Sequence, residues 1–364
     1  MFHLQTVLTT KCNLACKYCY INQDNQDMTL DIFKKHFSFI DDLFKQMNNQ
    51  EKFILGFFGG EPLLKIDLIE EIQRLVQTHS MYGGSFVATN GILLTKENQE
   101  RLNKLGIGFS VSFDGLWNKT NRVFHDDSSS FDCYQSEDII DVMKNRGVKS
   151  MISPSSVETL VENLEFFVDL GINFPDFTLV RDDVWDDNSI KQFDTNMQKL
   201  TNRVIQYWNE EQKFILPGIY SLYLLDTFLS KQGKRPFGCF AGVHGVSLMP
   251  SGDIYPCARF GSNQKLQIGN SVSKQINKET INFIKSIHNP IYYSKCKHCE
   301  LYKVCNVGCY YQQLETGQWK EMIPPDSVCR CFKIIYREAY KCFNFFKDKT
   351  EFKDYLEHRM KNSG

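Results

Sequence analysis

Short apolar runs and amphipathic stretches alternate along the chain from residue 4 to about residue 212. The apolar run at 4–8 has the length of a buried strand, and Thr29 then precedes a stripe of apolar residues spaced by three and four, which is typical of a helix with an N-cap. The strand–helix pattern recurs six times: strands are predicted at 4–8, 53–58, 86–88, 107–113, 148–152 and 177–180, and helices at 30–44, 66–76, 96–105, 139–143, 160–168 and 190–208.

This repeated order predicts an α/β protein with right-handed crossovers and a parallel sheet. Six units can form an open doubly wound sheet or a partial barrel, and the periodicity leaves both possible. After about residue 212 the pattern changes to short elements rich in Gly, Pro, Tyr and Cys. We therefore predict an α/β domain at 1–212, a bridging segment at 213–235, a small cysteine-rich domain at 236–348 and a charged tail at 349–364.

Composition and charge narrow the class of protein. The 364 residues correspond to about two domains of roughly 150 residues each. The 42 basic and 43 acidic residues nearly cancel, so electrostatic capture of nucleic acid is not expected. The N-terminus lacks a signal-peptide pattern, and no run approaches the roughly 18 apolar residues of a membrane span. We expect a cytoplasmic protein that does not enter a membrane.

The chain contains 13 cysteines, an odd number that fits poorly with disulfides and instead favours metal ligands. Cys12, Cys16 and Cys19 form a C-x3-C-x2-C pattern directly after the first predicted strand. Three thiolates at this spacing can bind three irons of one [4Fe–4S] cluster and leave the fourth iron open. A zinc site would need a fourth ligand nearby, and no Cys or His lies between Cys19 and His36.

The segment around these cysteines reads CNLACKYCY, which resembles the signature of the radical S-adenosylmethionine (SAM) enzymes. The resemblance implies a partial (β/α)6 barrel of the TIM type, with SAM bound through the open iron. Other polar motifs follow successive predicted strands, where a barrel places its active site. As isolated motifs, Gly-Gly-Glu-Pro and Asn-Gly are also ordinary turn sequences. By resemblance, the residues that contact SAM are Tyr18, Tyr20, Gly59, Gly60, Glu61, Pro62, Thr89, Asn90, Ser110, Ser112, Asp114 and Arg122.

The resemblance also implies roles for four of these residues. The two glycines would let the backbone approach the ligand. Glu61 would pair with the ammonium group of SAM, and Arg122 with its carboxylate.

The later cysteines are similar in arrangement to the seven-cysteine SPASM domain, which extends radical SAM enzymes and carries two auxiliary [4Fe–4S] clusters. Pro250-Ser251-Gly252-Asp253 predicts a hairpin turn within this region. By resemblance, the distal cluster is held by Cys296, Cys299, Cys305 and Cys329, and the proximal cluster by Cys239, Cys257 and Cys309.

Four assignments among the cysteines stay open or depart from the SPASM pattern. Gly233 stands where relatives with a fully ligated proximal cluster have a further cysteine, so substrate, water or His244 could fill an open iron; His244 is more simply a loop residue. Cys331 competes with Cys329, which we prefer. Cys133 and Cys342 are expected to be plain buried thiols. Without the resemblance, Cys296, Cys299, Cys305 and Cys309 could instead bind one structural zinc.

The resemblance implies a radical SAM oxidoreductase that cleaves SAM to a 5′-deoxyadenosyl radical and abstracts hydrogen from a residue of a ribosomally made peptide. We favour a maturase that forms a thioether or carbon–carbon cross-link. Sulfatase maturation is an alternative, although Ala258 stands where those enzymes place an Asp, and a non-catalytic zinc or iron–sulfur scaffold is a third. Partners would be the precursor peptide, an electron donor such as flavodoxin or ferredoxin, and a separate peptide-recognition protein. Arg181, Asp182 and Asp183 follow the sixth strand; the two Asp are weak catalytic candidates in a charged loop.

Overall fold

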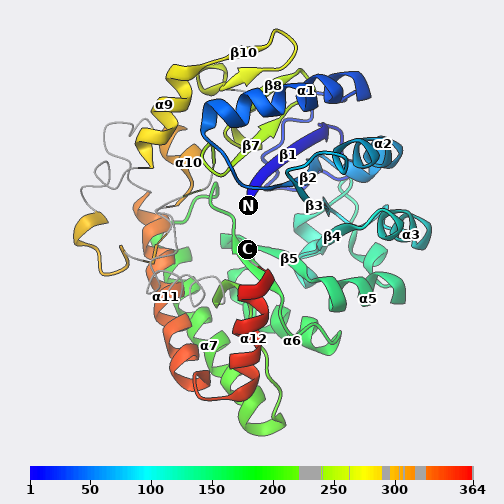
Figure 1. The fold of residues 1–364 in the computed structure, drawn as a ribbon. Coiled ribbons are helices and arrows are strands. Elements are labelled where there is room, and N and C mark those ends of the chain that lie inside the picture. Colours follow the sequence, from blue (N-terminus) through cyan, green and yellow to red (C-terminus); the bar gives the residue numbers. More distant parts are fainter. Residues whose placement is uncertain are drawn as a thin grey trace. The chain divides into compact units, whose positions relative to one another are not determined.

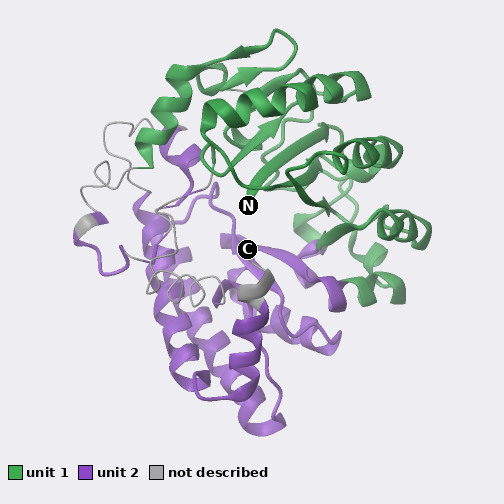
Figure 2. Ribbon diagram, viewed as in Figure 1, with its two compact units in different colours: residues 1–112, 119–142, 240–289 green, residues 113–118, 143–239, 290–364 purple. Residues whose placement is uncertain are grey.

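The computed structural model is a mixed α/β protein (Figure 1). It describes residues 1–220, 239, 241–261, 263–288, 296–302, 304–305, 308–315 and 325–362. These residues form two compact units, coloured separately in Figure 2. Unit 1 comprises 1–112, 119–142 and 240–289, and unit 2 comprises 113–118, 143–239 and 290–364. The predicted domain boundaries at 212, 235 and 348 stay predictions, and residues 221–235 of the bridging segment lie outside the described part.

The predicted strand–helix order is present along the chain. The elements of unit 1 are β1 (Phe2–Thr9), α1 (Leu30–Met47), β2 (Phe53–Gly59), α2 (Ile66–Val76), β3 (Tyr82–Thr89), α3 (Lys96–Lys104), β4 (Ile107–Ser112), β7 (Gly245–Leu248), β8 (Asp253–Tyr255), β9 (Gly269–Asn270), β10 (Gln275–Ile276) and α9 (Lys278–Ile287). Those of unit 2 are β5 (Val148–Ile152), α6 (Leu160–Asp169), β6 (Asp176–Leu179), α7 (Asp187–Glu211), α10 (Tyr310–Glu315), α11 (Asp326–Phe346) and α12 (Thr350–Asn362). The short α4 (Asn118–Asn121) and α5 (Glu137–Arg146) each contain residues of both units.

Two strands are longer than the sequence pattern predicted. The third strand begins at Tyr82, four residues before the predicted start, because the pair Gly83 and Gly84 interrupts the apolar run while the backbone still pairs with β2. The first strand likewise extends to Thr9, beyond its apolar residues.

The sheet of unit 1 is parallel in its first four strands, as predicted. β1, β2, β3 and β4 pair in chain order, and β7 pairs in parallel with the other edge of β1. β7 and β8 then form an antiparallel hairpin around Gly252, whose φ of +91° suits glycine, so the predicted hairpin is confirmed. A strand from the cysteine-rich part of the sequence is therefore a direct neighbour of the first strand.

One face of β1–β4 forms the core with α1, α2 and α3, which lie along it in Figure 1. Phe44 of α1 contacts Phe2 of β1 and Phe53 of β2 with ring centroids 5.1 and 5.9 Å apart. Along this face Leu55 and Val87 are fully buried. This arrangement follows from the alternation of side chains along each strand, since every second residue faces the helices.

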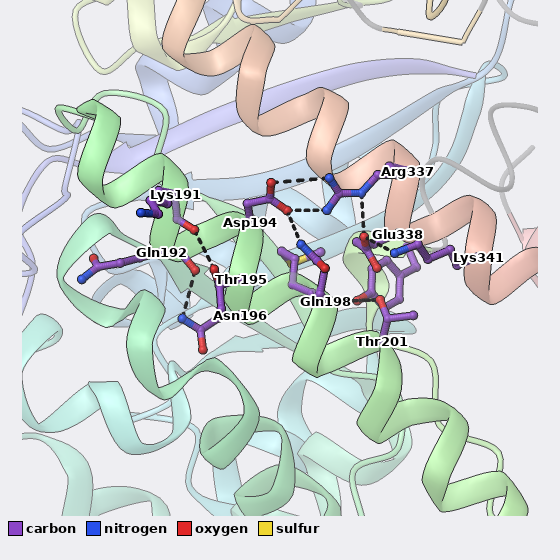
Figure 3. Close-up of polar contacts among 12 residues, drawn as sticks. Lys191, Gln192, Asp194, Thr195, Asn196, Gln198, Thr201, Arg337, Glu338 and Lys341 are labelled. Carbon is purple, nitrogen blue, oxygen red and sulfur yellow. Dashed lines mark hydrogen bonds and ion pairs between the residues drawn. The ribbon is translucent and has the colours of Figure 1, made fainter.

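In unit 2, α11 is held on α7 by charged groups (Figure 3). Arg337 pairs with both Asp194 of α7 and Glu338, and the Nζ of Lys341 lies 2.9 Å from the Glu338 carboxylate. Glu338 is fully buried, so two cations compensate a carboxylate that would otherwise be costly to desolvate. Because α11 also carries Cys329 near its N-terminus, these contacts help to position that thiol.

Among the described helices, none combines the length and apolar character required to cross a lipid bilayer.

A buried histidine connects α1 to the hairpin of unit 1. His36 is fully buried, and its Nε2 lies 2.9 Å from the backbone oxygen of Met249, so Nε2 carries the proton of the neutral ring. Burial lowers the pKa of His36 to about 4, partly offset by the Met249 oxygen and by the charge of Asp253.

We expect this histidine to make stability fall in mild acid. The unfolded chain binds a proton at His36 near pH 6.5, whereas the folded chain resists protonation until about pH 4, so unfolding free energy falls as the pH falls between these values. The difference in pKa corresponds to about 3 kcal/mol. His36→Gln removes the titration, and urea unfolding at pH 7, 6, 5 and 4.5 should show a smaller loss than in the wild type. Equal pH slopes for both proteins would contradict this assignment.

Candidate active site

The loop after β1 carries the first three cysteines. Cys12 and Cys16 are half-buried and Cys19 is exposed. Burial raises the pKa of the Cys12 thiol to about 11; the backbone N–H of Leu14 opposes this, and the charges of Glu61, Cys16 and Cys19 add to it. The three thiols therefore lie within electrostatic range of one another, and a bound cationic group would stabilise their thiolate forms.

The same loop is anchored to residues 121–125. The backbone N–H of Ala15 donates to the oxygen of Val123 at 2.8 Å, and that of Lys17 to the oxygen of Asn121 at 3.0 Å. The Nε2 of His125 lies 2.9 Å from the backbone oxygen of Cys12. These contacts place Arg122 beside the cysteine loop, although more than 100 residues separate the two in the sequence.

A cavity of about 540 Å³ lies against two of the thiols. It is lined by Lys11, Cys12, Ala15, Cys16, Gln23, Asn25 and His125. Neighbouring thiols that face open space fit an iron–sulfur cluster, whereas closely packed core cysteines would not.

Asp27 fastens the start of the loop. Its carboxylate lies 2.8 Å from the Nζ of Lys11 and 3.0 Å from that of Lys65, and it accepts a hydrogen bond from Thr9 at 2.6 Å. The Lys11 and Thr9 hydrogen bonds hold the pKa of Asp27 far below its usual range. Sequence reasoning missed Asp27 and His125, because single polar residues in loops carry no pattern that marks them.

Close contacts within the protein require glycine at positions 59 and 60. A Cβ on Gly59, whose φ is +148°, would lie 2.2 Å from the oxygen of Thr9, and one on Gly60 would lie 2.1 Å from that of Lys11. The N–H of Gly60 donates to Thr9 and that of Glu61 to Lys11. The two glycines therefore let the end of β2 approach the cysteine loop, which is a different reason from the approach to a ligand expected above.

Glu61 joins the ends of two strands. Its carboxylate is fully buried and accepts hydrogen bonds from the N–H of Leu63 at 2.9 Å, the hydroxyl of Thr89 at 2.7 Å and the N–H of Asn90 at 2.7 Å. Burial raises its pKa, while these bonds and the charge of Arg122 act in the opposite direction. Pairing of Glu61 with an ammonium group stays a prediction.

Asn90 connects the end of β3 to the cysteine loop. Its Nδ2 donates to the Oδ1 of Asn13 at 2.7 Å and lies 3.7 Å from the Sγ of Cys12. The hydroxyl of Tyr134 donates to the backbone oxygen of Asn90. Asn13 and Tyr134 were not foreseen as site residues.

The remaining predicted SAM contacts divide between the units. Arg122 is 6% exposed, and its Nη1 donates to the hydroxyl of Tyr18 at 2.9 Å. Arg259 lies 4.6 Å from the ring centre of Tyr20. Pro62 begins a 3₁₀ turn after Glu61, and Ser110 and Ser112 are half-buried on β4.

Asp114 belongs to unit 2 and has a structural contact there. It is fully buried, and its Oδ1 accepts a hydrogen bond from the N–H of Met151 in β5 at 2.8 Å. A contact of Asp114 with SAM stays a prediction.

Four of the later cysteines interact in unit 2. Burial raises the pKa of Cys329 to about 12, followed by the charges of Cys305, Cys296, Asp326 and Cys299. Burial likewise raises the pKa of Cys296 to about 11, with Cys305 and Cys299 contributing.

Cys331 has a different environment. It is fully buried, and burial raises its pKa to about 12, while the charge of Arg330 acts to lower it. Other cysteines do not contribute to this shift. This supports Cys329 rather than Cys331 as the thiol that shares a site with Cys296, Cys299 and Cys305.

The three cysteines predicted to hold the proximal cluster are divided between the two units. Cys239 and Cys309 lie in unit 2 and Cys257 in unit 1, and all three are half-buried. Gly233 lies outside the described residues. His244 lies 3.9 Å from the carboxylate of Glu51, in agreement with a loop residue. In the described part of the chain, no group of three or more Cys, His, Asp or Glu side chains is arranged to hold a metal ion.

Two further expectations have clear outcomes. Cys342 is buried as predicted, but Cys133 is exposed, so that prediction was wrong. Cys133 lies in a 3₁₀ turn (Phe131–Tyr134) whose inward residue is Tyr134. Asp182 and Asp183 are exposed, and burial followed by the charge of Asp182 raises the pKa of Asp183; their catalytic role stays a prediction.

Comparison with known proteins agrees with this geometry. A family model described as the radical SAM superfamily matches residues 6–182. The radical SAM cyclopropyl synthase TigE of Paramaledivibacter caminithermalis is 23% identical, over 92% of this chain and 73% of its own.

Solved structures extend the likeness to the whole chain. A structure of anSMEcpe with bound AdoMet covers 98% of both chains, with a TM-score of 0.74 and 16% identity. Streptococcus suis SuiB bound to precursor peptide SuiA has a TM-score of 0.57 and 18% identity, over 90% of this chain and 75% of that one. The predicted partial barrel followed by a cysteine-rich region is thereby confirmed as the fold.

The three hydrogen bonds of Glu61 generate a prediction. In Glu61→Gln one acceptor oxygen becomes an NH₂ group facing a donor, which should lower the unfolding free energy by about 2 kcal/mol. Urea unfolding under anaerobic conditions measures this change. Glu71→Gln, on the exposed side of α2, is the matched control and should change stability by less than about 0.5 kcal/mol. A similar small effect at position 61 would contradict the proposed role of the carboxylate.

Proposed function

Because the chain is a radical SAM enzyme related to the SPASM-domain peptide maturases, we propose that it forms a thioether or carbon–carbon cross-link in a ribosomally made precursor peptide. The observation that carries the proposal is the presence of two separate cysteine sets, one after β1 and one around α11. The relatives of the chain include a cyclopropyl synthase, and a protein of similar fold was solved with its precursor peptide.

The chain's own residues would perform distinct tasks. Cys12, Cys16 and Cys19 would hold the [4Fe–4S] cluster, and the burial of Cys12 fits a ligand that gains by binding cationic iron. When bound with SAM, the reduced cluster supplies a 5′-deoxyadenosyl radical that can remove hydrogen from an unactivated carbon. Asn90 orients Asn13 and donates toward Cys12, and Arg122, held by Tyr18, keeps a cation beside Glu61. We assign Arg122 to the carboxylate of SAM.

Two auxiliary clusters are part of the proposal. Cys296, Cys299, Cys305 and Cys329 would hold the distal one, and Cys239, Cys257 and Cys309 the proximal one. An external electron carrier such as flavodoxin or ferredoxin would supply reducing equivalents, and peptide capture would use this chain or a separate recognition protein.

The two alternative functions, a non-catalytic scaffold and a sulfatase-maturating enzyme, have different support. The non-catalytic scaffold is wrong, since the chain is a radical SAM enzyme. Sulfatase maturation is weakened by Ala258, a buried residue whose N–H donates to the Oε1 of Gln5 at 3.3 Å, where those enzymes would have a carboxylate. The similarity to anSMEcpe concerns the fold.

The choice between Cys329 and Cys331 gives an iron-content prediction. The fully loaded chain should contain about twelve iron atoms, four for each cluster. Cys329→Ala should lose about four of them, because it removes the thiol that interacts with Cys296, Cys299 and Cys305. Cys331→Ala is the matched control and should keep the wild-type iron content. Loss of iron in the second variant alone would reverse the assignment.

The proposed reaction is tested with the reduced, cluster-loaded enzyme, SAM and candidate short peptides from reading frames that neighbour its gene. We expect 5′-deoxyadenosine and a peptide product lighter by two hydrogens, detected by mass spectrometry. Replacing Cys12, Cys16 and Cys19 by Ala should reduce both products at least 100-fold. Formylglycine in a sulfatase-motif peptide, without change in the neighbouring peptide, would favour sulfatase maturation instead.

A further inference from the structure

Asn90 is fixed in one orientation at the end of β3. Its backbone N–H donates to the Oε2 of Glu61 at 2.7 Å, and its backbone oxygen accepts a hydrogen bond from the hydroxyl of Tyr134. The side chain is buried with it, since the residue is only 5% exposed. The side-chain Oδ1 accepts the N–H of Ile92 at 3.1 Å. Because Oδ1 is bound to Ile92, the NH₂ end of the amide must face the other way, toward the cysteine loop.

The NH₂ group of Asn90 has two hydrogens and two acceptors. Its Nδ2 lies 2.7 Å from the Oδ1 of Asn13 and 3.7 Å from the Sγ of Cys12. An amide nitrogen carries two N–H donors, so both contacts can form at once. The backbone N–H of Leu14 donates to the same sulfur at 3.4 Å. Cys12 therefore receives one N–H from its own loop and one from a strand end 78 residues further along the chain.

These donors act on a sulfur that we assign to iron. Hydrogen bonds to the sulfur ligands are one of the factors that set the reduction potential of an iron–sulfur cluster. Reduction takes one electron from the external carrier and makes the ligand sulfurs more negative, so an N–H donor stabilises the reduced state more than the oxidised state. The effect is stronger where less water competes, and Cys12 is half-buried whereas Cys19 is exposed.

We propose that Asn90 is a positioning residue that raises the reduction potential of the SAM-binding cluster through its hydrogen bond to Cys12. This inference rests on the proposed function, because it needs Cys12, Cys16 and Cys19 to hold that cluster. The role is separate from the contact with SAM predicted for Asn90, and it operates with or without SAM. Without the donor, a carrier of given potential would deliver the electron for SAM cleavage to fewer molecules.

The midpoint potential of the cluster tests this role. Iron-loaded protein without SAM is titrated anaerobically with titanium(III) citrate, and the reduced cluster is followed by EPR. Subtracting the signal of the triple variant Cys12→Ala, Cys16→Ala, Cys19→Ala isolates this cluster from the auxiliary ones. At the wild-type midpoint, Asn90→Ala should lower the ratio of reduced to oxidised cluster about tenfold, which corresponds to about 59 mV for one electron. A change of less than about threefold would overturn the proposal.

Two further variants separate the loss of a donor from a loss of stability. Asn90→Asp places a carboxylate oxygen beside the sulfur, so its midpoint should lie below that of Asn90→Ala. Gln73→Ala is the matched control, because it also removes a buried amide of unit 1, one that donates to Tyr82 and Leu105. It should keep the ratio within about twofold of the wild type. Equal shifts in Asn90→Ala and Gln73→Ala would contradict a specific role for Asn90.

An unsubstituted chain gives an independent measurement. Protein labelled with ¹⁵N in the side-chain amides of asparagine should show, after reduction, a ¹⁵N hyperfine coupling to the cluster in pulsed EPR. The coupling should disappear in Asn90→Ala and persist in Asn13→Ala, because Ile92 still orients the Asn90 amide there. Absence of the coupling from the wild type would overturn the proposal even if every variant failed to fold.

The same titration distinguishes this inference from the proposed function. If the triple variant kept the whole EPR signal of the wild type, Cys12, Cys16 and Cys19 would not hold a cluster, and the proposed function would fall together with the inference. A cluster signal that is lost in the triple variant but keeps the wild-type midpoint in Asn90→Ala would overturn only the role of Asn90.

Discussion

The buried carboxylate of Glu61 is the contact on which the geometry of the site depends. It accepts hydrogen bonds from Leu63, Thr89 and Asn90, and so holds together the ends of β2 and β3. A carboxylate in this position is costly unless all its acceptors are used, and the charge of Arg122 lowers the cost further. Because the ends of β2 and β3 both donate hydrogen bonds to one buried carboxylate, they cannot move independently. The cysteine loop contacts both of these strand ends.

Binding of a cluster at these thiols would consequently be coupled to the stability of the loop. Cys12 is half-buried next to Glu61, so its thiolate is disfavoured until a cation is present. Asn90 reaches the same sulfur from β3, while Asp27 and His125 fasten the loop from its two sides. These hydrogen bonds therefore hold the loop in place, and a bound cation would remove the remaining electrostatic penalty. The same logic applies to Cys329, which is surrounded by other thiols at the start of α11.

Sequence patterns recovered the strand–helix order, the hairpin at Gly252 and the family, because each depends on residues close together in the chain. They failed where a neighbour came from elsewhere. Cys133 was expected to be buried and is exposed, since only the adjacent Tyr134 faces inward from its turn. Asp27 and His125 gave no signal, because a polar loop residue acquires a role only through the partner that folding brings to it. Pairing of β7 with β1 likewise joins residues more than 200 positions apart.

The sequence by itself determined the chemistry that we propose for this protein: the spacing of Cys12, Cys16 and Cys19 predicts three ligands of one cluster whatever surrounds them. Only the tertiary structure decided which residues pack around the site and which segments approach one another there. The register of parallel strands put Phe58 and Phe86 beside Gly56 on one face, and the approach of β2 to the loop gave the Gly-Gly pair a packing reason in addition to the predicted ligand reason. Ligand type and spacing are local properties of the chain, whereas burial, close approach and the sharing of one carboxylate exist only between segments that folding brings into contact.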